Sequence, residues 1–234
     1  MKSLRWPLLA VAAVLALVPI TTLADNGESS PTLSFFSGGG GAQAHWIVTA
    51  DQPPGDTDKQ AIEIHTTTTG SAGVLVHHVT GIPATAFPDS SYWVKGPAGA
   101  TLGSPRLIVT FQTPAGTPDG DAQLTPNAFT GDWQFVSDTF LPHVQNGWDI
   151  HSATCPFVYH DTWTTAQACH VNDTVSSVYI VTDPYGITYL VDDITVDGKS
   201  FSSASDNGGG INDAAGPAAT MDTSLLPPLL FPPF

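Results

Sequence analysis

The side chains most able to do chemistry gather between residues 143 and 170, where four of the eight histidines lie with both cysteines. This segment also contains Trp148, Tyr159, Asp161 and Trp163. Aromatic rings stack on the apolar face of a sugar ring, while carboxylates and imidazoles bind its hydroxyl groups. We therefore expect these four residues to form a ligand-binding site of saccharide type.

Two alternatives apply to the same segment. Trp163 and Tyr159 could instead form a small core for it, and exposure of the rings distinguishes the two cases. Asp149, Asp161 and His151 are close enough in sequence to be considered for acid–base catalysis. The chain has no G-x-S-x-G, H-E-x-x-H or phosphate-loop motif. We therefore assign no catalytic residue and keep a hydrolase or lyase as the alternative function.

The two cysteines of the chain predict one disulfide bond, Cys155–Cys169. In an exported protein a pair of cysteines forms a bridge more readily than a metal site. The bridge closes a segment of 15 residues, which the chain-entropy model values at ~3 kcal/mol. It would stabilise a segment that has little core of its own.

An acidic residue interrupts the apolar pattern near the end of the chain. Residues 175–201 contain two runs rich in β-branched and aromatic residues, joined by Asp183–Pro184–Tyr185–Gly186, so we predict a hairpin with a type I turn. Alternation then places Leu190, Ile194 and Val196 on the inward face. Asp192 has the same parity. A buried carboxylate needs a cation or several hydrogen-bond donors.

The rest of the chain predicts short strands separated by turns rich in glycine and proline, and no amphipathic helix longer than two turns. Before the hairpin we predict six strands: 45–49, 60–67, 73–79, 91–95, 106–112 and 133–140. This pattern is typical of an all-β fold, a single β-sandwich of jelly-roll type. We place the domain at residues 45–201.

Three flanking segments differ in composition from this domain. Residues 1–24 have a basic start, an apolar core and a small-residue end at Ala24, which predicts a cleaved signal peptide and secretion. Residues 25–44 are predicted to be a flexible lead-in, in which 33–36 could pair as a first strand. Residues 202–234 end in leucine, proline and phenylalanine, and we expect this tail to be disordered or loosely docked.

The charge of the chain limits its partners. Cleavage at Ala24 leaves 4 basic and 21 acidic residues, a net charge of −17 with neutral histidines. Phosphate binding needs clustered lysine and arginine, so we expect no nucleic acid partner. No segment after the leader is long enough to span a membrane. The acidic residues do offer oxygen ligands to hard cations such as Ca²⁺.

Two stretches resemble the galactose-binding-like jelly rolls, a family that includes carbohydrate-binding modules of secreted proteins. Residues 131–142 are similar to its strand G-x-W-x-x-x-S-x-T-F-x-P, and residues 189–196 to its last strand, Y-x-x-D-D-V-x-V. The resemblance implies that Trp133 is a core residue. It also implies that Asp192 helps to hold a structural Ca²⁺, for which we expect further ligands from Asp58 and its loop. The alternative is that backbone N–H groups or Arg106 satisfy Asp192.

These observations favour a secreted, non-catalytic β-sandwich module that binds carbohydrate or cell-surface glycan and carries a structural calcium. A third possibility, besides the hydrolase or lyase, is a structural or adhesion protein of the cell envelope whose proline-rich end docks elsewhere. Fold alone does not choose among them. The sequence specifies neither the glycan nor the oligomeric state.

Overall fold

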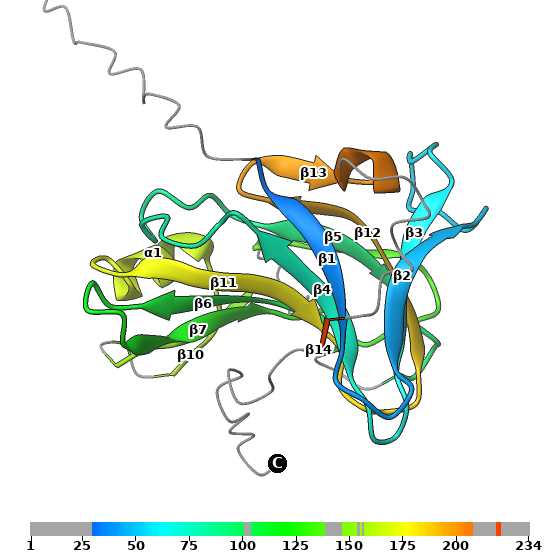
Figure 1. Cartoon of the computed structure of the whole chain (residues 1–234), viewed down its shortest axis with the longest axis horizontal. Coiled ribbons are helices and arrows are strands. Elements are labelled where there is room, and N and C mark those ends of the chain that lie inside the picture. Colours follow the sequence, from blue (N-terminus) through cyan, green and yellow to red (C-terminus); the bar gives the residue numbers. More distant parts are fainter. Residues whose placement is uncertain are drawn as a thin grey trace, which may run out of the picture.

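The computed structural model describes residues 30–100, 104–138, 147–153, 155, 157–207 and 219–220. Within these residues the chain forms two stacked sheets and one short α-helix (Figure 1). All strand pairs are antiparallel except β1 with β14. The predicted all-β sandwich is confirmed. The predicted leader lies outside the described residues, and no helix among the described ones is long and apolar enough to cross a membrane.

Sheet A contains eight strands, in the order β10 (Val158–Asp161), β9 (Trp148–His151), β7 (Pro118–Leu124), β6 (Arg106–Gln112), β11 (Thr174–Val181), β4 (Ala72–His77), β1 (Thr32–Ser37) and β14 (Ala219–Thr220). Sheet B contains β2 (Gln43–Val48), β3 (Gln60–His65), β12 (Thr188–Val196), β5 (Ser91–Lys95) and β8 (Gln134–Val136), and β13 (Lys199–Phe201) pairs with β12. Helix α1 (Trp163–Cys169) lies near the β6–β7 end of the molecule, and β2 and β3 lie at the other end (Figure 1).

The core lies between the sheets because each strand alternates inward and outward side chains. Tyr92 and Val94 of β5 and Leu107 and Val109 of β6 are fully buried, as is Trp148 of β9. The folded part extends beyond the predicted domain limits at both ends. Strand β1 lies in the expected lead-in, and β14 and the 3₁₀ helix η1 (Ala204–Asn207) lie in the expected tail.

The predicted hairpin at 175–201 is wrong in its pairing, although both strands are present. Strand β11 pairs with β6 and β4 in sheet A, whereas β12 pairs with β3 and β5 in sheet B. The turn therefore carries the chain from one sheet to the other. Its first residue is held from outside the turn, since Arg106 donates to Asp183 at 2.7 Å and the Asp183 N–H donates to Ser104.

A β-bulge in β12 means that Leu190, Ile194 and Val196 do not share one inward face, as the sequence predicted. The register with β5 shifts between Asp192 and Thr195, and Asp193 has a positive φ of 45°. Before the bulge Tyr189 and Val191 are buried, and after it Ile194 and Val196 are buried. Leu190 is therefore on the outward face, because the extra residue of a bulge reverses the alternation.

Candidate functional site

Three carboxylates meet where the β2–β3 loop crosses strand β12. Asp56 and Asp58 come from the loop and Asp192 from the bulge, and one oxygen of each lies within 4.8 Å of the others. Asp192 is fully buried. The fold thus brings together the two residues expected to bind metal, Asp58 and Asp192, and adds Asp56 to them.

Each carboxylate of this cluster divides its two oxygens between different tasks. The Oδ1 atoms accept backbone N–H groups close in sequence: Asp56 from Thr57 and Asp58, Asp58 from Gln60, and Asp192 from Asp193. The three Oδ2 atoms are buried and have no hydrogen-bond partner. Buried polar atoms are nearly always paired, so three unpaired carboxylate oxygens in one cluster are an uncommon arrangement.

The electrostatics of the cluster agree with its geometry. Burial raises the pKa of Asp192 to about 9, against the hydrogen bond from the Asp193 N–H, and the carboxylates of Asp193, Asp56 and Asp58 raise it further. No ion pair with lysine or arginine involves these three carboxylates in the described part of the chain. Arg106 pairs with Asp183 instead. A backbone N–H group, the alternative to a cation, satisfies Oδ1 of Asp192, whereas Oδ2 has no hydrogen-bond partner.

Trp148 and Trp163, expected at a binding site, pack in the core. They are 0% and 4% exposed, and their ring centroids are 4.6 Å apart. Trp163 also contacts Phe87 edge to face, and its indole N–H donates to the Phe87 carbonyl at 2.8 Å. A saccharide cannot stack on rings that are covered on this scale, and the packing alternative holds for Trp163 but not for Tyr159, which is exposed.

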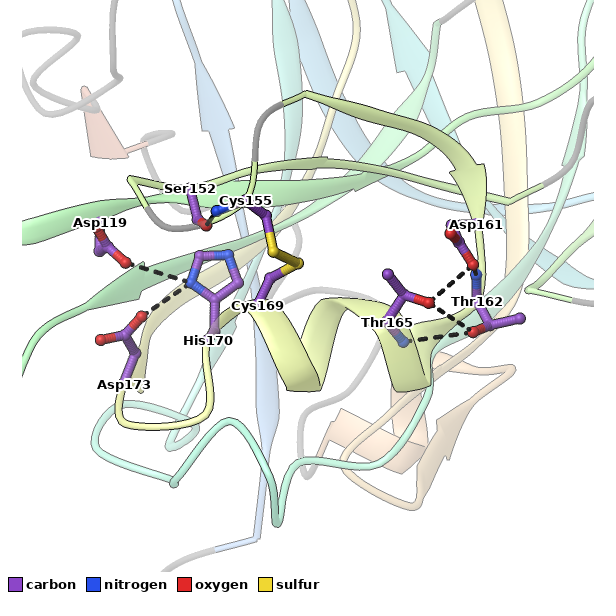
Figure 2. The surroundings of a disulfide bond; sticks show 9 residues. All are labelled: Asp119, Ser152, Cys155, Asp161, Thr162, Thr165, Cys169, His170 and Asp173. Carbon is purple, nitrogen blue, oxygen red and sulfur yellow. Dashed lines mark hydrogen bonds and ion pairs between the residues drawn. A yellow bond between two sulfur atoms is a disulfide. The ribbon is translucent and has the colours of Figure 1, made fainter.

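Asp161 organises the start of helix α1. Its Oδ1 accepts the Thr162 N–H and the Thr165 hydroxyl, while Thr162 caps the helix by accepting the Thr165 N–H (Figure 2). At the other end of the helix the predicted disulfide Cys155–Cys169 is confirmed. The polar residue expected to bind ligand and the bridge therefore both fix this helix.

A second acidic group adjoins the disulfide. The buried imidazole of His170 stacks on Phe111, and its Nδ1 lies 2.9 Å from Asp173 Oδ2 and 3.8 Å from Asp119 Oδ2 (Figure 2). Burial raises the pKa of Asp119, and its hydrogen bond with Asp173 raises it further. Here both carboxylates face Nδ1 of one imidazole, a partner that the cluster around Asp192 lacks, while His170 Nε2 is buried with no hydrogen-bond partner.

The exposed aromatic residues of the segment are Tyr159 and Phe157, which are 57% and 45% exposed. Their ring centroids are 4.3 Å apart, and Phe157 lies 3.7 Å from the His151 ring. We call Phe157, Tyr159 and His151 the aromatic strip. Sequence reasoning missed Phe157, although its alternation with the partly buried Val158 places it on the same outward face as Tyr159.

Polar groups of β7 and β9 lie beside the strip. Asp121 accepts from both His151 and Gln123, while Asp149 accepts the His160 N–H at 3.1 Å. Burial is the main cause that raises the pKa of Asp149. Histidine–aspartate pairs are what the hydrolase or lyase alternative requires. However, His151 Nε2 is buried, so this imidazole is not open to a substrate proton.

Trp133 corrects the expectation drawn from the family resemblance. Its side chain is partly exposed, and its indole N–H donates to Asp51 at 3.0 Å. Val136 is fully buried and Phe135 is exposed. Trp133 has the parity of Phe135 and therefore lies on the outward side of sheet B.

No protein-family model and no curated protein matches this chain. Solved structures similar to it include carbohydrate-binding modules. The family 11 module of the cellulase Lic26A-Cel5E of Clostridium thermocellum has 12% identity and a TM-score of 0.40, over 74% of this chain and 91% of its own. A family 30 module has 12% identity and a TM-score of 0.41, over 76% and 88%.

A third similar structure is that of an arabinose-bound α-L-arabinofuranosidase. It has 14% identity and a TM-score of 0.39, over 72% of this chain and 24% of that one. The two modules are of the kind that the sequence motifs resembled. The fold assignment itself rests on the two sheets, and the function is argued from the residues of the sites.

Proposed function

We propose that this protein is a secreted, non-catalytic β-sandwich module that binds carbohydrate through the aromatic strip. The observation that carries the proposal is the pair of exposed rings, Phe157 and Tyr159, in contact on the edge of sheet A. Large apolar side chains are seldom left together at a surface without a partner. A pyranose has a flat apolar face that such rings can cover.

The neighbours of the strip suit the hydroxyl groups of a sugar. Asp149 offers a carboxylate, and Gln123 offers an amide from the adjacent strand, while the buried Asp121 holds His151 and Gln123 in place. The carboxylate of Asp149 and the amide of Gln123 can exchange hydrogen bonds with hydroxyl groups. Because the chain has an excess of acidic residues and no lysine or arginine in this group, we expect a neutral glycan in preference to an anionic one.

We also propose a structural Ca²⁺ held by Asp56, Asp58 and Asp192. The unpartnered oxygens support it, because Ca²⁺ takes six to eight oxygen ligands, and waters or carbonyls commonly complete the set. When bound, the ion would neutralise the repelling carboxylates. Asp56 and Asp58 would then hold the β2–β3 loop to Asp192.

The experiment for carbohydrate binding is affinity electrophoresis and calorimetry with a panel of neutral polysaccharides and their hexasaccharides. Tyr159→Ala and Phe157→Ala should each weaken binding roughly tenfold. Tyr185→Ala is the matched control, since this tyrosine is 45% exposed and lies outside the strip. Thermal melting of every variant shows whether the fold is retained.

Two results would reject the proposal. One is unchanged affinity in both strip variants, and the other is equal weakening in the Tyr185 control. Release of new reducing ends from any glycan of the panel would instead support the hydrolase or lyase alternative.

A further inference from the structure

The outward face of sheet B presents a second pair of aromatic side chains. Trp93 of β5 and Phe135 of β8 are direct partners in the strand register. Their sequence neighbours Tyr92, Val94 and Val136 are fully buried, so both rings lie on the side away from the core. The ring centroids are 5.3 Å apart, and Phe135 is 44% exposed.

A polar group beside this pair is already held in place. Asp51 of the β2–β3 loop accepts the Trp133 indole N–H at 3.0 Å, and Lys95 Nζ lies 2.8 and 2.6 Å from its two oxygens. These hydrogen bonds hold the side chains of Trp133, Lys95 and Asp51 together on the outward face of sheet B. The pieces come from three parts of the chain, so only the folded protein brings them together.

An open pocket of about 440 Å³ begins at Lys95 and continues past Gly96, Pro97, Gly131 and Leu190. It is a shallow hollow that is largely open to solvent, not an enclosed cavity. Its lining is mainly apolar, and Lys95 is its charged residue among those described. Lys95 lines this hollow, and Trp93 lies two residues before it on the same face of β5.

The charges around this face select the kind of partner. Asp192 pairs with Trp93 in the strand register, which places the carboxylate cluster next to the aromatic pair. Lys95 is neutralised by Asp51. Anionic partners such as uronate chains, nucleic acid or acidic lipid surfaces are disfavoured here, whereas a neutral sugar meets aromatic faces and polar groups together.

We propose that this face, the sheet B platform of Trp93, Phe135, Trp133, Lys95 and Asp51, is a second binding surface for a neutral saccharide chain. The aromatic strip belongs to sheet A and the platform to sheet B. The two surfaces are made by different residues, so the platform does not require the strip. A polymer that reaches both would be held more tightly than a short oligosaccharide, because the second contact becomes intramolecular.

The experiment counts binding sites per chain with neutral hexasaccharides (cello-, xylo- and manno-oligosaccharides) by calorimetry and NMR titration. Trp93→Ala should remove the site at the platform and leave the site at the aromatic strip. Tyr159→Ala should do the reverse. In the Tyr159→Ala background, adding Trp93→Ala should weaken the remaining binding at least roughly tenfold. Phe135→Ala provides a second test, in case the tryptophan variant is poorly folded, and melting temperatures verify the fold.

The two proposals fail separately in this design. A folded Trp93→Ala or Phe135→Ala variant with unchanged site number and affinity overturns the platform, whatever happens at Tyr159. A wild-type chain that sediments as a dimer, and that becomes monomeric in the Trp93 variant without binding any saccharide, also overturns it, since the face would then cover a second copy of the chain.

Discussion

Replacement of Asp192 by Asn tests the carboxylate cluster, because it removes one negative charge and keeps the size of the side chain. One oxygen of each carboxylate lies within 4.8 Å of the others, so the three charges repel, and the Oδ2 atom of each lacks a hydrogen-bond donor. Without a cation, wild-type protein can relieve this repulsion only by taking up a proton. Asp192→Asn should therefore be the more stable protein in excess chelator at mildly alkaline pH.

The pH dependence follows from the pKa of Asp192, which is raised from 3.8 to about 9 on folding. A carboxyl whose folded pKa is the higher one binds its proton more strongly in the folded state. The stability of cation-free wild type should therefore fall as pH rises from 3.8 toward 9. Burial also raises the pKa of Asp89, to about 7, helped by the Asp138 carboxylate, so the variant should keep a smaller fall that ends near neutral pH.

Calcium should reverse this order of stability. A ligand at about 100 times its Kd stabilises the folded state by ~2.7 kcal/mol. For a domain of this size that raises Tm by roughly 5–11 °C. Wild-type protein should show this shift in differential scanning calorimetry, with Ca²⁺ against EDTA. Asp192→Asn should show almost none, and the exposed control Asp132→Asn should respond like wild type.

The reasoning is refuted if wild-type Tm is the same in Ca²⁺ and EDTA across this pH range. It is also refuted if Asp192→Asn responds to Ca²⁺ as strongly as wild type does.

Three further predictions concern packing and cross-links, each measured by urea unfolding with circular dichroism. Trp163→Ala should lower the free energy of unfolding by ~3–5 kcal/mol, because it empties a core site. A change in this free energy no larger than the experimental error would show that the indole is not buried. Cys155→Ser with Cys169→Ser should cost ~3 kcal/mol, and reduction of wild type should have the same effect. Asp183→Ala should lower the free energy of unfolding by ~3–5 kcal/mol, since it leaves the buried Arg106 charge without this carboxylate. An unchanged free energy of unfolding would contradict the buried ion pair.

Local patterns were sufficient for several of the strands, though not for β7, β9 and β10, and for singling out Asp192, Asp58 and the cysteines. Strands Ser91–Lys95 and Arg106–Gln112 have the bounds expected from sequence, because alternation and β-branched residues act within the strand itself. The disulfide follows from there being two cysteines. Asp192 was identified by its misfit with its neighbours and Asp58 by its acidic loop, and the fold places both in one cluster.

The sequence placed Asp192 on the inward face because one alternation was continued along the whole strand. The bulge interrupts that alternation. The residue is nevertheless buried, because the β2–β3 loop lies over the outward side of β12 and contributes Asp56 and Asp58 to the cluster. A bulge depends on how the partner strand pairs, and this information is absent from the strand's own sequence.

By itself the sequence determined that the chain is an all-β sandwich, where several of its strands lie, and that the cysteines are joined, but β7, β9 and β10 were not predicted. Only the tertiary structure decided that β11 and β12 lie in different sheets, because the same turn can join paired strands or cross between layers. It also decided that Trp148 and Trp163 are covered while Tyr159, Phe157 and Phe135 are exposed. Local patterns show which neighbouring rings share a side of a regular strand, but exposure of a ring depends on whether distant parts of the chain pack over that side.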